Sequence, residues 1–248
     1  MIDGHETFAK APIEEALLDF RVERSAPVDL KIVDPFLDAV SPEFANRQPR
    51  IEFESRLEFD VHGVQNFAND RRVKGWLLRS ADGRHVIQPT ADGLTISQLK
   101  PYSRWEDLVE IARRLWDVYS RTSQPVSLTR ISTRFINRIV IPAVKFRFDE
   151  WFLTGPTLGP NVPDQLTELL MRMVVKDGDG KSAAVVTLVT QPPDELSRTP
   201  VIFDIETFTS LSLSPTDDSI WREVKELRDF KNRVFFGSIT EKTKELFR

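Results

Sequence analysis

The stretch that decides the fold runs from residue 124 to residue 144 and reads QPVSLTRISTRFINRIVIPAV. Between Ser127 and Ile141 it has no glycine and is rich in Ile, Val, Thr and Phe, which favour β-strands. Its apolar residues do not recur every three or four positions, as the buried face of a helix requires. The stretch therefore predicts one long strand, which Pro142 ends because proline lacks a backbone donor for the sheet.

Side chains of this predicted strand alternate between two faces. One face is mostly apolar and consists of Thr129, Ile131, Thr133, Phe135, Asn137, Ile139 and Ile141. The other face carries Arg130, Arg134 and Arg138, whose guanidinium groups match carboxylates and phosphates. Two interpretations stay open at this point. The arginines form a surface that binds an anionic partner, or they pair with acidic residues of neighbouring strands. The chain offers Glu52, Glu54, Glu58, Asp204 and Glu206 for such pairs.

The same order of elements is expected twice: a strand, a short helix, several antiparallel strands and a long helix. In the first half we expect strands at residues 13–23, 50–61, 72–80, 86–90 and 94–99. In the second half we expect them at residues 127–141, 166–175, 183–190 and 200–208, with a short helix near 149–153 and a loop at 209–215. This order predicts an α+β fold with two similar lobes, residues 1–122 and 123–248, joined as one structural unit. It resembles a duplicated TATA-binding-protein-like arrangement, with the helices on one side of curved sheets.

Two long helices are predicted from apolar residues that recur at helical spacing. The first has the stripe Trp105, Leu108, Ala112, Leu115, Trp116 and Tyr119. The second has the stripe Ile220, Val224, Leu227 and Val234. Ser103 and Glu106 predict a capping box before the first helix, and Ser238 and Glu241 predict a short last helix.

Composition limits the classes of protein that fit the chain. Of its 248 residues, 40% are hydrophobic and 29% are charged, as in ordinary globular proteins, and the net charge is -4. No window approaches the roughly 18 consecutive apolar residues of a membrane span, so we expect no membrane association. The absence of cysteine excludes disulfides and thiolate metal sites, and no basic segment precedes an apolar one near residue 1. These features predict a cytoplasmic protein.

Motifs of known catalytic or cofactor chemistry are absent from the sequence. No glycine-rich phosphate loop occurs, and the three histidines, His5, His62 and His85, lack metal-ligand spacing. Residues 177–180, DGDG, lack the further oxygen ligands of a calcium loop and predict a hairpin turn. We therefore expect no metal and no cofactor, and these absences favour a non-catalytic protein while leaving an enzyme of unrecognised type open.

A second basic cluster surrounds a predicted hairpin and includes Arg71, Arg72 and Lys74. Nucleic-acid-binding sheets combine such residues with aromatic side chains that stack on bases. Here Trp76 is the nearby aromatic residue, so this cluster gives weak support for RNA binding.

Four short motifs resemble those of a known family. They are P-I-E-E-A at residues 12–16, R-F-I-N-R-I-V-I-P at 134–142, I-F-D-I-E at 202–206, and Phe236, Ile239, Thr240, Lys242, Thr243 and Phe247 near the end. Together they resemble an uncharacterised bacterial family of similar length that is distributed sporadically among genomes. The resemblance implies no activity and no catalytic residues. The sporadic distribution implies a component of a bacterial defence or toxin–antitoxin module.

Three functions remain. The first is a non-catalytic interaction protein that binds a protein partner through the charged strand face. Its candidate contact residues are Arg130, Arg134, Asn137, Arg138, Asp204 and Glu206. The second is a nucleic-acid-binding protein that uses the arginines of that face. The third is an enzyme of unrecognised type, which requires a pocket with at least two titratable groups. The oligomeric state stays open.

Overall fold

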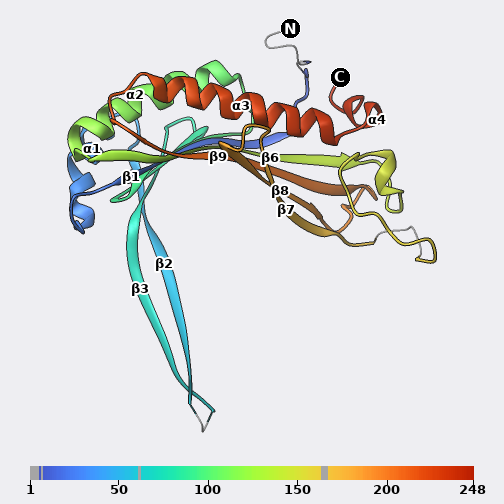
Figure 1. The fold of residues 1–248 in the computed structure, drawn as a ribbon, viewed down its shortest axis with the longest axis horizontal. Coiled ribbons are helices and arrows are strands. Elements are labelled where there is room, and N and C mark those ends of the chain that lie inside the picture. The colour runs from blue at the N-terminus through green and yellow to red at the C-terminus, as the bar shows by residue number, and fades with distance from the viewer. Residues whose placement is uncertain (1–5, 7, 61–62, 163–166) are drawn as a thin grey trace.

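A computed structural model describes residue 6 and residues 8–60, 63–162 and 167–248. For residues 52–60 and 63–72 it describes the backbone alone. The fold is α+β, as the sequence predicts, and is built on one large antiparallel sheet (Figure 1).

The sheet has nine strands in the order β2-β3-β4-β5-β1-β6-β9-β8-β7. The strands are β1 (Ile13–Glu23), β2 (Asn46–Asp60), β3 (Gly63–Arg79), β4 (His85–Thr90), β5 (Gly93–Leu99), β6 (Ser127–Ile141), β7 (Leu170–Lys176), β8 (Ser182–Thr190) and β9 (Thr199–Leu213). β1 and β6 pair at the centre of the sheet and join its two halves. The strand predicted from the opening stretch therefore holds the middle of the molecule.

Two long helices, α2 (Trp105–Ser123) and α3 (Ser219–Ser238), lie along one face of the sheet (Figure 1). Two short helices, α1 (Asp34–Val40) and α4 (Glu241–Lys244), and two 3-10 turns, Leu30–Val33 and Phe148–Glu150, complete the fold. α1 packs against α2, and α3 packs against β6, β8 and β9. Within the described part of the chain, no helix is long and apolar enough to cross a membrane.

The hydrophobic core fills the space between the helices and the sheet in two clusters. Under α2, Phe20 of β1 packs against Trp116 with ring centroids 4.8 Å apart. Under α3, Phe203 of β9 stacks on Phe235 with centroids 5.7 Å apart. Burial of a large apolar side chain such as Phe20 or Phe203 stabilises the fold by about 1.5–3 kcal/mol. One face of the sheet is therefore committed to the core.

A two-stranded arm projects from the sheet. β2 and β3 pair along their length and extend away from the other strands (Figure 1). β3 pairs with β4 only near its end, at Gly75, Leu78 and Arg79. The arm thus separates from the body of the sheet before its tip.

β6 has the predicted bounds, but other element boundaries differ from the prediction. The predicted loop at 209–215 is wrong over most of its length, because β9 continues to Leu213. Thr209 is buried between Ser182 of β8 and Ile131 of β6, which satisfy its backbone. The Ser- and Thr-rich sequence there concealed a strand that tertiary pairing stabilises.

The predicted helix starts were also displaced. Arg104 occupies the N-cap of α2 and makes no side-chain cap, while the Ser103 hydroxyl donates to the Asp107 carboxylate at 2.7 Å. Thr240, rather than Ser238, caps α4 and accepts from the Thr243 backbone N–H. The helix expected near 149–153 is a single 3-10 turn. Of these three helix starts, only that of α4 is satisfied by a capping side chain.

Candidate binding sites on the two faces of the sheet

Neighbouring residues of β6 face opposite sides of the sheet. Arg130, Arg134 and Arg138 lie on the face away from α3, which we call the open face. Asn137 is only 2% exposed and lies on the helix side. The candidate set of contact residues predicted from the sequence is therefore divided between two surfaces.

The arginines of the open face are largely neutralised by the protein itself. Arg134 donates two hydrogen bonds to the Asp204 carboxylate of β9, from Nε at 2.9 Å and from Nη2 at 2.6 Å. These bonds raise the pKa of Arg134 and keep it charged. Arg130 donates to Glu206 at 2.6 Å and lies 3.7 Å from Asp19. The interpretation that these arginines pair with acidic residues of neighbouring strands is confirmed for Asp204 and Glu206.

The remaining predicted basic residues are dispersed. Arg138 is half-buried on β6 and has no ion pair among the described residues. Lys74 is exposed at the base of the arm. The side chains of Arg71 and Arg72, like those of Glu52, Glu54 and Glu58, lie outside the described residues.

An aliphatic patch covers the open face of β7, β8 and β9. Cross-strand pairing places its members in two rows, Leu170 with Val189 and Ile202, and Val174 with Val185. Arg172, Thr187 and Asp204 pair across the strands between these two rows. Leu170 is 74% exposed and Val174 is 55% exposed, while the other three are half-buried. We call Leu170, Val174, Val185, Val189 and Ile202 the aliphatic patch. Adjoining exposed aliphatic residues of this kind are typical of interaction surfaces.

β7 is the end strand of the sheet, and no strand in the described part of the chain pairs with its outer backbone edge. Its pairing with β8 runs without a bulge, and it contains no proline, two devices that normally protect an edge. Arg172 and Lys176 are the charged residues of this strand. The edge and the aliphatic patch adjoin and form one continuous surface.

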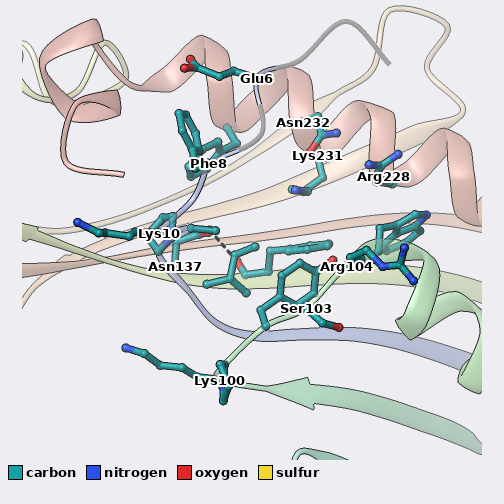
Figure 2. Close-up of a pocket in the computed structure, with 18 of the residues that line it drawn as sticks. Glu6, Phe8, Lys10, Lys100, Ser103, Arg104, Asn137, Arg228, Lys231 and Asn232 are labelled. Atoms are coloured by element: carbon teal, nitrogen blue, oxygen red, sulfur yellow. Dashed lines mark hydrogen bonds between the residues drawn. The ribbon is translucent and has the colours of Figure 1, made fainter. Parts of the chain in front are cut away.

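The helix side contains a pocket of about 470 Å³. Four segments line it: the N-terminal segment before β1, the connection from β5 to α2, the middle of β6, and α3 (Figure 2). Aromatic rings form much of the wall: Phe8, Tyr102, Trp105, Phe135, Phe235 and Phe236. The volume suits a small organic ligand.

Lys231 of α3 is the central feature of this pocket. Its side chain extends from the helix into the space above β6 (Figure 2), and the residue is only 8% exposed. Its ammonium lies 3.7 Å from the centroid of the Phe135 ring. Among the described residues no carboxylate pairs with it and no group accepts a hydrogen bond from it. Burial, with a smaller contribution from Arg228, lowers the pKa of Lys231 to about 7.

Other polar groups of the pocket surround this amine. Asn232 is 8% exposed, and its side-chain amide has no hydrogen bond to any described residue. Asn137 donates to the Phe203 carbonyl at 2.9 Å, which fixes the amide against β9. Burial raises the pKa of Tyr102, so its hydroxyl stays protonated and cannot serve as a base. A buried ammonium without a paired carboxylate can bind an anionic group of a ligand as its counter-charge.

Charge around the pocket is predominantly positive. The lining residues include the cations Lys10, Lys100, Arg104, Arg228 and Lys231, against the carboxylates Glu6 and Glu106. Both carboxylates are exposed, and Glu6 is paired with Arg248 at 2.7 Å. Within the described part of the chain, no group of His, Asp and Glu residues is arranged to hold a metal ion.

Sequence reasoning missed this pocket, although one signal was present. Lys231 follows Leu227 by four residues and precedes Phe235 by four, so it occupies the buried stripe of α3. A lysine at a position where the helical spacing requires an apolar side chain indicates a buried cation.

Three motifs that carry the family resemblance meet at this pocket. Pro12 and Ile13, then Phe135 and Asn137, and finally Phe236 all line it. No protein-family model matches the chain, and no curated protein matches it significantly. Membership of the sporadically distributed bacterial family therefore stays a prediction.

Proposed function

We propose that this protein is a non-catalytic interaction protein whose open face binds a protein partner. The observation that carries the proposal is the aliphatic patch beside the unpaired edge of β7. Leu170 and Val174 expose most of their apolar surface to water there, at 74% and 55%. Covering them would contribute about 25 cal/mol for each Å² removed from water.

The partner's chemistry follows from this edge. An extended segment can pair with the free backbone of β7 and place alternate side chains on the aliphatic patch. Arg172 and Lys176 favour carboxylates beside these apolar groups. We therefore propose an extended segment of a partner protein with alternating aliphatic and acidic residues.

The open face gives less support to the nucleic-acid alternative. A phosphate contact requires cations that are free to replace counterions. Arg130 and Arg134 are already paired with Glu206 and Asp204, whose carboxylates would repel phosphate. Arg138, without such a pair among the described residues, is the cation of this face that best supports this alternative.

We also propose that residues 1–122 and 123–248 are two related lobes in a TATA-binding-protein-like arrangement. The strand order supports this. β5, β4, β3 and β2 follow outward from the central β1–β6 pair on one side, and β9, β8 and β7 follow on the other. Each long helix follows the strand next to the centre, α2 after β5 and α3 after β9. Assignment to a defence or toxin–antitoxin module in the cytoplasm rests on the resemblance and the composition alone.

The test of partner binding compares two valine substitutions of nearly equal exposure. Val174→Glu places a charge in the aliphatic patch, and Val126→Glu places one elsewhere, where the valine is 57% exposed. The tagged variants and the natural chain are expressed in the native host and purified, and bound proteins are quantified by mass spectrometry. We expect one stoichiometric partner with the natural chain and with Val126→Glu. We expect at least about a tenfold loss with Val174→Glu, because the glutamate removes an apolar contact at the centre of the interface and competes with the partner's carboxylates for Arg172 and Lys176.

A partner retained by Val174→Glu would show that the patch is not the contact. A chain purified without any companion, and monomeric by light scattering at high concentration, would contradict the proposal itself. Retention on heparin that weakens steeply with salt would instead support nucleic-acid binding.

A further inference from the structure

The helix-side pocket lies across the sheet from the aliphatic patch and shares none of its residues. Its walls combine residue 6 and segments from residues 8–13, 100–106, 135–137 and 228–236. Partner binding on the open face therefore does not explain the residues that line this pocket.

Two polar side chains in this pocket have no protein partner that satisfies them. Lys231 and Asn232 are each 8% exposed, and neither side chain forms a hydrogen bond with a described residue. Buried polar groups in folded proteins are normally hydrogen-bonded, and a buried charge is normally paired. The Phe135 ring, 3.7 Å from the ammonium, offers partial compensation through its π-electrons but no acceptor lone pair.

We infer that the pocket binds a small aromatic carboxylate whose anionic group pairs with the Lys231 ammonium and whose ring packs among the aromatic walls. Asn232 follows Lys231 in the sequence and also lines the pocket. Its side-chain amide offers both a donor and an acceptor to the ligand's polar atoms. The rings of Phe8, Trp105 and Phe235 supply the apolar surroundings that an aromatic body requires.

A single negative charge fits the pocket better than a phosphate. Lys100 is paired with Glu14 at 2.8 Å, and Arg104 is paired with Asp107 at 2.6 Å, so these rim cations are already neutralised. Of the other lining cations, Lys10 is exposed and Arg228 is half-buried, so Lys231 is the buried cation at the centre, and it balances one carboxylate. A doubly charged ligand would leave the second charge buried without a partner.

Binding of a carboxylate should be linked to proton uptake. The pKa of Lys231 is about 7, so at pH 8 most molecules carry a neutral amine. An anion beside it favours the charged form, and the amine takes up a proton when the ligand binds. The charged or titratable groups that line the pocket together with Lys231 are Arg228 on α3, Glu6 and Lys10 on the segment before β1, and Lys100, Tyr102, Arg104 and Glu106 between β5 and α2.

The test uses isothermal titration calorimetry with benzoate, 2-naphthoate and indole-3-acetate, and with 2-naphthamide as a neutral control. We expect a carboxylate to bind with uptake of nearly one proton at pH 8 and almost none at pH 6, measured in buffers of different ionisation heat. Lys231→Met keeps the apolar stem and removes the amine. It should weaken carboxylate binding by about tenfold or more and abolish proton uptake. Lys225→Met, on the exposed side of α3, should change neither.

Three results would overturn the inference: none of the carboxylates binds at millimolar concentration, 2-naphthamide binds as well as 2-naphthoate, or Lys231→Met binds as tightly as the natural chain. The proton count needs no variant, so binding at pH 8 without proton uptake would also overturn it. Val174→Glu should bind the carboxylate normally, which separates this site from the partner surface.

Discussion

Position 231 lies in the apolar stripe of α3, where an apolar side chain is expected, but the residue there is a lysine. Leu227 and Phe235, one turn before and after, are buried in the core. The lysine stem can pack with them, but its ammonium loses contact with water, which disfavours the charged form. Such a residue lowers stability where a methionine would raise it, and its presence is best explained by a ligand.

The free energy of unfolding should depend on pH in a way that reflects the titration of Lys231. The pKa of Lys231 is about 7 in the folded chain and near its ordinary 10.5 in the unfolded chain. Between these values the unfolded chain binds more protons, so the free energy of unfolding rises with pH. Relative to Lys231→Met, the natural chain should gain up to about 1.4 kcal/mol per pH unit between pH 7 and pH 10.

Urea denaturation of both chains at pH 7, 8 and 9 measures this difference, and the other titrating groups cancel in the comparison. A difference in unfolding free energy that stays constant over this range would show that Lys231 titrates normally in the folded chain.

At the scale of the element, alternation within one strand could be predicted from the sequence, whereas contacts between distant segments could not. β6 was recognisable because most of its residues favour strands, and because its three arginines share one face while the other face is mostly apolar. The end of β9 was not, because Ser and Thr favour loops locally and only pairing with β6 and β8 makes them a strand. The ion pairs of Arg130 and Arg134 were one of two open interpretations. The pocket escaped prediction because its four walls are far apart in the sequence.

The turn between β4 and β5 should tolerate no side chain at Gly93. Its φ is 155°, and a Cβ atom there would lie 2.1 Å from the Phe20 carbonyl oxygen of β1. Because backbone atoms on both sides would have to move, Gly93→Ala should destabilise the fold by more than about 2 kcal/mol. Gly178→Ala serves as the control, since a Cβ there meets nothing within 4 Å.

Thermal and urea unfolding of both alanine variants measure the effect. Equal stability of Gly93→Ala and Gly178→Ala would mean that β1 and the turn do not approach as closely as described.

For the whole molecule, the projecting arm and the body of the sheet are separate structural units. The two core clusters lie between the sheet and its helices, and β3 meets β4 only at its last residues. Among the described backbone segments, the outer part of the arm has strand pairing only between β2 and β3.

Shortening the arm should therefore leave the fold intact. Joining Ile51 to Val73, which are paired across the arm, through an Asn-Gly turn removes the outer part and keeps the register. We expect the melting temperature to change by less than about 4 °C, corresponding to about 1 kcal/mol or less. Calorimetry would contradict this expectation if cooperative unfolding were lost. The shortened chain should also keep the partner that Val174→Glu loses.

The alternation of β6 also limits how the protein can change over time. Asn137 lines the pocket, and the side chain of Arg138 lies on the opposite face of the sheet. Inserting or deleting one codon between them would move the side chains on one side of the change to the other face of the sheet. A guanidinium would then enter the cavity, and aromatic rings would move into water. Length variation should accumulate in the arm and in the turn at residues 177–180, while the central strand keeps a constant number of residues across any descendants of this gene.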